Sequence, residues 1–169
     1  MPSTEPATAG SAASTLTAAQ VWQALAKASF AVLSHVTPAG EPRASGVLYA
    51  VADRRLYVVV APDSWKARHI AADGHVAVTV PVRRGGVLAM LFPIPPATVS
   101  FRASALVYPA DAPGRLLPAR LSALLPPDRR GKAAVIEMCP VGDFLTYGLG
   151  VSLRQMRDPG LARDRVPAD

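Results

Sequence analysis

Cysteine is nearly absent from this chain, and its one cysteine, Cys139, excludes an intrachain disulfide and any thiolate metal cluster built from a single chain. Long hydrophobic runs are also missing, because the apolar stretches 56–61 and 87–92 are far shorter than the roughly 20 residues of a membrane-spanning helix. The N-terminus lacks the basic start and apolar stretch of a signal peptide. We therefore expect a cytoplasmic protein in which residues 1–15 form a disordered leader.

Aromatic residues make up only 6% of the chain, although its formal charge is +6. A basic surface attracts anions in general, including nucleic acids, acidic lipids and phosphorylated cofactors. Proteins that bind single-stranded nucleic acid stack its bases on aromatic side chains, and here the basic residues are scattered apart from short pairs such as Arg83–Arg84. We expect neither a nucleic-acid nor a membrane partner, and a nucleic-acid-associated β-barrel ranks last of three functional hypotheses.

Several signatures of catalysis and nucleotide binding are missing as well. No Gly-rich dinucleotide fingerprint or phosphate loop follows a predicted strand, which argues against Rossmann and P-loop folds. The three histidines, His35, His69 and His75, are too widely placed to form a metal pair on one element. We interpret His69 as a surface polar residue, predict no metal site, and find no Ser–His–Asp arrangement in the spacing.

The sequence does contain many short strand-like segments within the length of one domain. Its 169 residues, half of them hydrophobic, suit a domain that buries roughly 70% of its unfolded surface. Apolar, β-branched segments bounded by turn residues predict strands at 30–36, 43–51, 56–61, 75–80, 87–92, 97–108, 132–138 and 143–149. Helical spacing and capping residues predict helices at 18–28, 65–72 and 116–125.

Six or more short strands with few helices indicate a mainly β protein with a barrel or sandwich architecture. Short turns join the first three strands, which we interpret as an antiparallel meander. Residues 16–152 are assigned to one domain. Residues 153–169 are assigned to a polar C-terminal tail that lies on the surface or on a partner subunit.

The segment Asp63-Ser-Trp-Lys-Ala-Arg68 opens the second predicted helix and carries the chemistry of an anion site. The start of a helix exposes unpaired N–H groups and the positive end of the helix dipole. Ser64 adds a hydroxyl, Lys66 and Arg68 add charge, and each charge-assisted hydrogen bond to a phosphate is worth roughly 1.5–3 kcal/mol. On these residues alone, an ordinary cap by Asp63 or Ser64 with solvated charges is the more common explanation.

The order of elements around this segment resembles the pyridoxamine-phosphate-oxidase-like, FMN-binding split barrels, a family that includes deazaflavin-dependent reductases. The segments that carry the resemblance, about a third of the chain, are Phe30-Ala-Val-Leu-Ser34, Gly40-Glu-Pro-Arg43, Gly46-Val-Leu-Tyr49, Leu56-Tyr-Val-Val-Val-Ala61, Ser64-Trp-Lys66 and Ile70-Ala-Ala-Asp-Gly-His-Val-Ala-Val78. The resemblance implies that residues 16–152 form a cofactor-binding split β-barrel. It has six to eight antiparallel strands of Greek-key type, flanked by short helices, and its cofactor lies at the interface of a homodimer.

The resemblance also implies a set of cofactor-binding residues. In this family a Ser-x-Lys at the helix start holds the cofactor phosphate, and a preceding strand passes along the ring system. The residues assigned in this way are Ser64 and Lys66 for the phosphate, Ser45, Gly46 and Val47 for the ring through backbone groups, Val59, Val60 and Ala61 for the ribityl side, and Arg43 as a further positive contact.

The identity of the cofactor stays open between FMN and the deazaflavin coenzyme F420. Flavin-phosphate enzymes of this kind usually carry a tandem Arg-Lys, whereas Trp65 precedes Lys66 here. Residues 144–156 carry no recognisable substrate signature of the pyridoxamine oxidase, so vitamin B6 oxidation is not implied. The first hypothesis is an oxidoreductase that transfers a hydride or electrons to a small organic substrate, with no catalytic residue assigned because the cofactor carries the chemistry. The alternative is a non-catalytic binder or carrier of flavin, deazaflavin, haem or another tetrapyrrole.

Overall fold

The structure is a computed structural model, and it describes residues 16–84, 94–112 and 132–168. The predicted leader 1–15, the strand 87–92 and the helix 116–125 lie outside these ranges. The strands are β1 (Phe30–Val36), β2 (Pro42–Leu48), β3 (Ala50–Ala52), β4 (Arg55–Val60), β5 (His75–Val82), β6 (Ala97–Pro109), β7 (Ala134–Tyr147) and β8 (Arg163–Pro167). The helices are α1 (Ala18–Lys27), α2 (Trp65–Asp73) and α4 (Pro159–Ala162), with a 3-10 helix, η3 (Gln155–Arg157).

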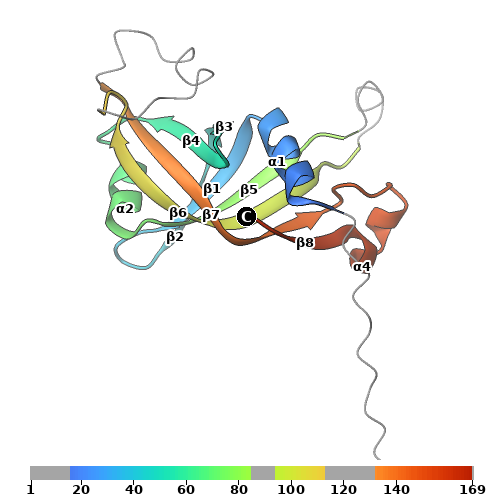
Figure 1. The fold of residues 1–169 in the computed structure, drawn as a ribbon. Helices are drawn as coiled ribbons and strands as arrows, with labels where there is room; N and C mark the ends of the chain where they lie inside the picture. The colour runs from blue at the N-terminus through green and yellow to red at the C-terminus, as the bar shows by residue number, and fades with distance from the viewer. Residues whose placement is uncertain (1–15, 85–93, 113–131, 169) are drawn as a thin grey trace, which may run out of the picture.

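These strands form one curled antiparallel sheet (Figure 1) in the order β2-β1-β5-β6-β7-β4-β3, with β8 paired to β7 beside this path. β2 and β3 lie at opposite ends of the order, yet only Tyr49 separates them in the chain. The sheet must therefore curl until its two ends approach each other. The predicted mainly β split barrel with short flanking helices is confirmed.

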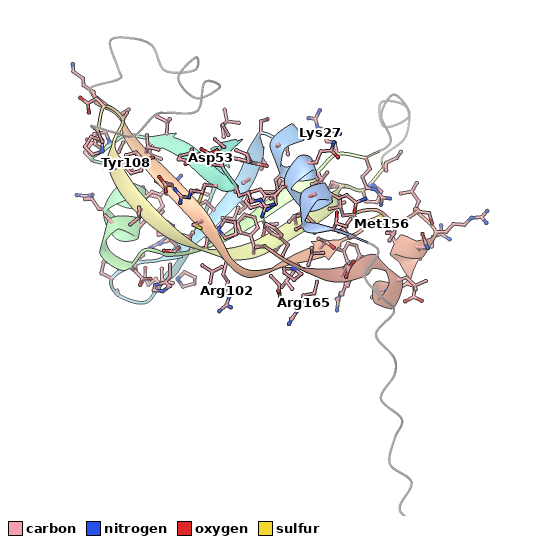
Figure 2. The ribbon with its side chains drawn as sticks, in the orientation of Figure 1. Lys27, Asp53, Arg102, Tyr108, Met156 and Arg165 are labelled. Atoms are coloured by element: carbon pink, nitrogen blue, oxygen red, sulfur yellow. The ribbon has the colours of Figure 1, made fainter. Side chains whose placement is uncertain are left out.

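One apolar cluster fills the inside of the curled sheet. The inward residues of β1, Ala31 and Leu33, are fully buried, and Ile70 of α2 and Leu25 of α1 join them. α1 begins as predicted at a capping box, in which Gln20 N–H donates to Thr17 Oγ1 at 3.3 Å and Thr17 N–H donates to Gln20 Oε1 at 2.8 Å. In Figure 2, Arg102 and Arg165 on the outer surface of the sheet point away from the barrel.

The predicted meander of the first three strands is wrong in one respect. The segment predicted as a single strand, 43–51, is divided at Tyr49 into β2, which pairs with β1, and β3, which pairs with β4. β4 therefore joins β3 and β7 rather than β2. The strand-like pattern of residues continues across Tyr49. The sequence therefore does not show that the pairing partner changes there from β1 to β4.

The last two predicted strands form one strand, β7, which continues through Pro140. The N-terminal part of β7, residues 134–138, pairs with β4, and its C-terminal part, residues 143–147, pairs with β8. Residues 139–141 pair with β6 alone. A proline that cannot donate a backbone hydrogen bond is tolerated at such a half-paired position.

The C-terminal segment adds a strand to the sheet. β8 pairs with β7, Val166 lies in the main core at 3% exposure, and the indole Nε1–H of Trp22 donates to the carbonyl oxygen of Ala168 at 3.2 Å. Figure 1 shows this segment running along the sheet to the C-terminus. None of the described helices is long and apolar enough to cross a membrane.

Candidate functional site

The N-terminus of α2 presents unused hydrogen-bond donors. Ser64, not Asp63, is its N-cap, and Ser64 Oγ accepts from Ala67 N–H at 3.2 Å. This leaves the hydroxyl hydrogen of Ser64 free to donate, because the cap uses the oxygen only as an acceptor. The N–H groups of Trp65 and Lys66 have no partner within the helix, since an α-helix leaves its first N–H groups unpaired. The predicted helix start is confirmed.

Lys66 lies in the first turn of α2 and is half-buried. Burial lowers the pKa of its ammonium group, because desolvation disfavours the charged form. None of the ion pairs between described residues involves Lys66. A half-buried ammonium without a carboxylate partner among the described residues therefore lies beside free N–H groups, an arrangement typical of anion sites at helix N-termini.

β2 offers an open backbone edge at the position predicted to meet the ring. It pairs with β1 on one side, and it is the terminal strand of the sheet, so part of its N–H and C=O groups lack a strand partner. Ser45 and Val47 lie opposite Leu33 and Ala31, which places their side chains on the inner face, whereas Gly46 lies on the outer face. A Cβ atom at Gly46 would lie 2.8 Å from Phe30 Cε2, so the absence of a side chain lets this ring cover the strand.

β4 contributes a second open edge next to β2. β3 pairs with residues 55–57 of β4 only, while β7 pairs with residues 56–60, so residues 58–60 have one unpaired side. β2 and β4 contact each other across this gap. Val60 packs against the main core and Val59 against a second apolar cluster on the other face of the sheet, and Ala61 follows the strand exposed. Because α2 begins four residues after Ala61, the open edge of β4 leads to its N-terminus.

Arg43 lies directly opposite His35 in the β1–β2 pair and is exposed. Its guanidinium Nη2 forms an ion pair with Glu41 Oε2 at 2.8 Å. Both side chains are more than half exposed, and ion pairs of this kind contribute little to stability, so Arg43 can exchange Glu41 for another anion at small cost. Arg43 and Lys66 both act electrostatically on His35, which places the two cations on the same side of the barrel.

The two histidines of this region come together, although the sequence separates them widely. The ring centroids of His35 and His69 are 5.6 Å apart, and each lies 5.6 Å from the ring of Trp65. His35 is only 4% exposed. Burial and the positive charges of His69, Lys66 and Arg43 all lower the pKa of His35. His69, predicted to be a surface polar residue, is half-buried and lies against His35. The alternation in 30–36 is a signal for the inward direction of His35, but it carries no information on which residue lies next to it.

A separate hollow of about 1170 Å³ lies between α1, the end of β5 and Leu149–Gly150. None of the nine predicted cofactor-binding residues lines it. Phe30 does line it, and the same ring lies against Gly46 on β2. The hollow therefore adjoins the outer face of the strand predicted to carry the cofactor ring.

Comparisons with solved structures find the same fold in proteins with different ligands. An F420 reductase matches with a TM-score of 0.51 and 18% identity over 72% of this chain and 93% of its own. A FAD-binding protein from Mesorhizobium loti matches with a TM-score of 0.56 and 19% identity over 74% and 88%. HutZ, a haem storage protein from Vibrio cholerae, matches with a TM-score of 0.60 and 13% identity over 78% and 95%. At these identities the likeness shows the fold alone.

The sequence itself identifies the family. A search of curated proteins found no match. The profile of the family described as pyridoxamine 5'-phosphate oxidase matches residues 17–136, which span β1 to β6, α2 and the start of β7. This match covers most of the chain and includes every residue assigned to the cofactor site. The chain belongs to the pyridoxamine 5'-phosphate oxidase-like split-barrel family.

Proposed function

We propose that this protein is an oxidoreductase that uses FMN or the deazaflavin coenzyme F420. The observation that carries the proposal is Lys66, a half-buried ammonium in the first turn of α2 with no carboxylate partner among the described residues. Anions bind at helix N-termini because the free N–H groups and the helix dipole favour negative charge. Both cofactors carry such an anion.

The residues at the start of α2 fit a phosphate group. Lys66 would supply the charge, Ser64 its hydroxyl hydrogen, and the backbone N–H groups of Trp65 and Lys66 two further donors. Ser45, Gly46 and Val47 would meet the ring through the open edge of β2, and Val59, Val60 and Ala61 would line the chain that joins ring to phosphate. Arg43 would add a positive charge once its ion pair with Glu41 is broken. The bound cofactor supplies hydride or electron transfer, so the protein needs to bind it, orient it and exclude water.

The hollow beside Phe30 supports a small organic substrate. Its volume of about 1170 Å³ is ample for a small molecule. Lys27 and Arg83 give it positive charge, and Phe30 and Leu149 give it apolar walls. Since Phe30 also covers Gly46, a substrate in this hollow would reach the outer face of β2 when that ring moves aside.

A homodimer with a shared cofactor site completes the proposal. Phe30 and Leu48 are opposite each other in the β1–β2 pair, and their side chains are 44% and 60% exposed. This apolar pair flanks the predicted ring strand. A second copy that covers it would exclude water from the cofactor and contribute the other wall of two equivalent pockets.

The second candidate function is non-catalytic binding of haem or another tetrapyrrole. His35 and His69 favour it, because histidine is a common axial ligand of haem iron, and the likeness to the haem storage protein HutZ is compatible with it. The cationic side chains Lys66 and Arg43 could then hold a propionate. This alternative requires the ring of Trp65, which contacts both histidines, to give way to the ligand.

A cofactor titration separates the two functions. Purified protein is titrated with FMN, F420 and haem, and binding is followed by quenching of cofactor fluorescence or by the haem absorption band. We expect saturable binding of FMN or F420, and reduction followed by reoxidation of that cofactor with a carbonyl or enone acceptor. Binding of haem alone would contradict the oxidoreductase, and binding of flavin or F420 without turnover by any acceptor would favour a carrier.

A further inference from the structure

Four buried polar atoms on α2, β1 and β2 lack hydrogen-bond partners among the described residues. Both ring nitrogens of His35, Nδ1 of His69 and Oγ of Ser45 are buried, and none of them has a partner among the described residues. The residues come from three elements: His35 from β1, Ser45 from β2 and His69 from α2. A buried polar group without a partner is costly and calls for an explanation. His35 and His69 lie against Trp65 at the start of α2, and Ser45 lies opposite Leu33, two residues from His35 on the same face, so we look for a ligand-linked role for this group.

The charged groups around the pair His35 and His69 indicate the kind of ligand that binds beside it. Arg43 faces His35 from β2, Lys66 and His69 face it from α2, and β5 presents the apolar Val76 opposite it. The groups that act on His35 are all cationic or basic, and no carboxylate is among them in the described part of the chain. Of the acidic residues nearest in sequence, Glu41 and Asp73 pair with Arg43 and His75, and Asp63, directly before the helix, is exposed. A free metal cation, unlike an iron carried in an anionic porphyrin, would be repelled here, whereas an anion would be attracted.

An anion at Lys66 would change the protonation of the histidines. In its absence, burial and the positive charges of His69, Lys66 and Arg43 lower the pKa of His35. A bound phosphate compensates those charges and adds its own negative charge, which favours an imidazolium ion. Trp65 lies against both rings, and His35 is only 4% exposed, so this interaction acts partly through protein, where charges are less screened than in water.

We propose that His35 and His69 form a proton-linked part of the anion site, so that binding of a phosphate group at the N-terminus of α2 is accompanied by uptake of one solvent proton by the pair. The inference rests on the phosphate site proposed above and adds its regulation. By linkage, the factor by which the anion raises the proton affinity of the pair equals the factor by which the proton raises the anion affinity. The site therefore binds its anion more tightly at about pH 6 than at pH 8, across the range where histidine titrates.

The histidine signals of the full chain give a direct test. The sequence has three histidines, so their Cε1–Hε1 NMR resonances can be assigned with single variants. Sulfate is the probe, because it stays a dianion over the whole range. We expect saturating sulfate to raise the pKa of at least one histidine of the pair by about one unit, a tenfold change in proton affinity. His75, which is exposed and paired with Asp73 at 2.9 Å, is the internal control and should not move.

Affinity measurements provide the matched test. Sulfate affinity of the wild type should fall several-fold from pH 6 to pH 8, within the tenfold limit that a one-unit pKa change sets by linkage. The double variant His35→Asn/His69→Asn should lose this dependence, and His75→Asn should keep it. If the double variant does not fold, His69→Asn and the wild-type NMR titration decide. Sulfate binding that leaves both pKa values unchanged, or an unaltered pH dependence in the variants, would overturn the proposal.

Failure of this inference and failure of the proposed function have different signatures. FMN or F420 binding that depends on Lys66 but leaves both histidine pKa values unchanged overturns the proton linkage and keeps the function. Sulfate that raises a histidine pKa in a protein binding neither FMN nor F420 keeps the linkage and overturns the oxidoreductase. No binding of sulfate, FMN or F420 overturns both.

Discussion

Two cationic side chains at the start of α2 differ in what surrounds them. Lys66 is half-buried, and burial lowers its pKa, whereas Arg68, two residues later, is exposed. A lysine that is held partly out of water without a carboxylate costs free energy in the ligand-free protein. This cost is offset when an anion binds, so Lys66 rather than Arg68 is the residue whose removal should weaken cofactor binding.

The buried histidine makes an acid-sensitive contribution to folding. The pKa of His35 is lower in the folded protein than its ordinary value of 6.5, so above that value the residue is neutral in both states and contributes nothing. As the pH falls below 6.5, the unfolded chain binds the proton more readily and stability is lost. Each unit of pKa difference is worth about 1.4 kcal/mol.

We therefore expect His35→Asn to flatten the loss of stability in acid. Urea unfolding at pH 5, 6 and 8 measures it, and the comparison is between slopes with pH rather than absolute stabilities, since the substitution also alters packing. His75→Asn is the control. Asp73 raises the pKa of His75, so that residue stabilises at low pH and loses its contribution as pH rises. An equal acid loss in His35→Asn and the wild type would contradict this account.

At the residue scale, the helix-start residues of the site could be predicted from the sequence, but the contact between its two histidines could not. Ser64 and Lys66 follow from the chemistry of a helix start, which is local, and the family resemblance added their role. The contact between His35 and His69 depends on how α2 packs against β1, and 34 positions separate the two residues. No local pattern encodes that packing. The alternation of β1 fixes the inward direction of His35 but not the identity of its neighbour.

Tyr49 joins β2 and β3, the two strands that lie at opposite ends of the sheet order. Its hydroxyl donates to the carbonyl oxygen of Leu25 at 2.7 Å, and its side chain is 5% exposed. This bond ties the turning point between β2 and β3 to the last turn of α1. Burial raises the pKa of Tyr49, so the hydroxyl stays protonated as a donor at any physiological pH.

We expect Tyr49→Phe to lower the free energy of unfolding by about 1–3 kcal/mol, because the buried carbonyl of Leu25 loses its partner. Tyr147→Phe is the matched comparison. It removes a 2.9 Å bond to the carbonyl of Met156 at a half-buried position, where water can replace the hydroxyl, so its effect should be smaller. Chemical denaturation of both variants measures the difference. Equal losses would show that Tyr49 has no special part in closing the barrel.

Most element types could be predicted because their signals are local. The capping box of α1, the strand Phe30–Val36 and the cap of α2 by Ser64 all follow from neighbouring residues. The division at Tyr49 and the continuity of β7 through Pro140 could not be predicted in this way. Both depend on which strand pairs on each side, and pairing partners come from distant parts of the chain.

The C-terminal strand belongs to the core and can be tested with two valines. Val166 on β8 is 3% exposed, and Val141 on β7 is 49% exposed. Val166→Ala should cost about 2 kcal/mol through lost burial and the cavity it leaves. Val141→Ala should change stability by less than about 0.5 kcal/mol. If thermal and urea unfolding find the two variants alike, then β8 does not stabilise the barrel.

At the scale of the whole molecule, the exposed pair Phe30 and Leu48 leads to an expectation about assembly. Leu48→Glu places a charge on this patch, whereas Leu161→Glu places one on α4, where the leucine is 54% exposed. We expect the wild type and Leu161→Glu to sediment as dimers and Leu48→Glu to shift toward monomers with weaker cofactor binding. A wild-type monomer that binds its cofactor fully would contradict the shared pocket.

The central claim concerns the anion site at the start of α2, and one titration tests it most directly. Wild type, Lys66→Ala and Lys27→Ala are titrated in parallel with FMN and F420, where Lys27 ends α1 on another part of the barrel (Figure 2) and controls for the loss of a lysine. We expect the wild type and Lys27→Ala to bind one of the two cofactors equally well, and Lys66→Ala to bind it roughly tenfold more weakly, the loss of one charge-assisted contact. Unchanged affinity in Lys66→Ala, or no binding of either cofactor by the wild type, would contradict the account.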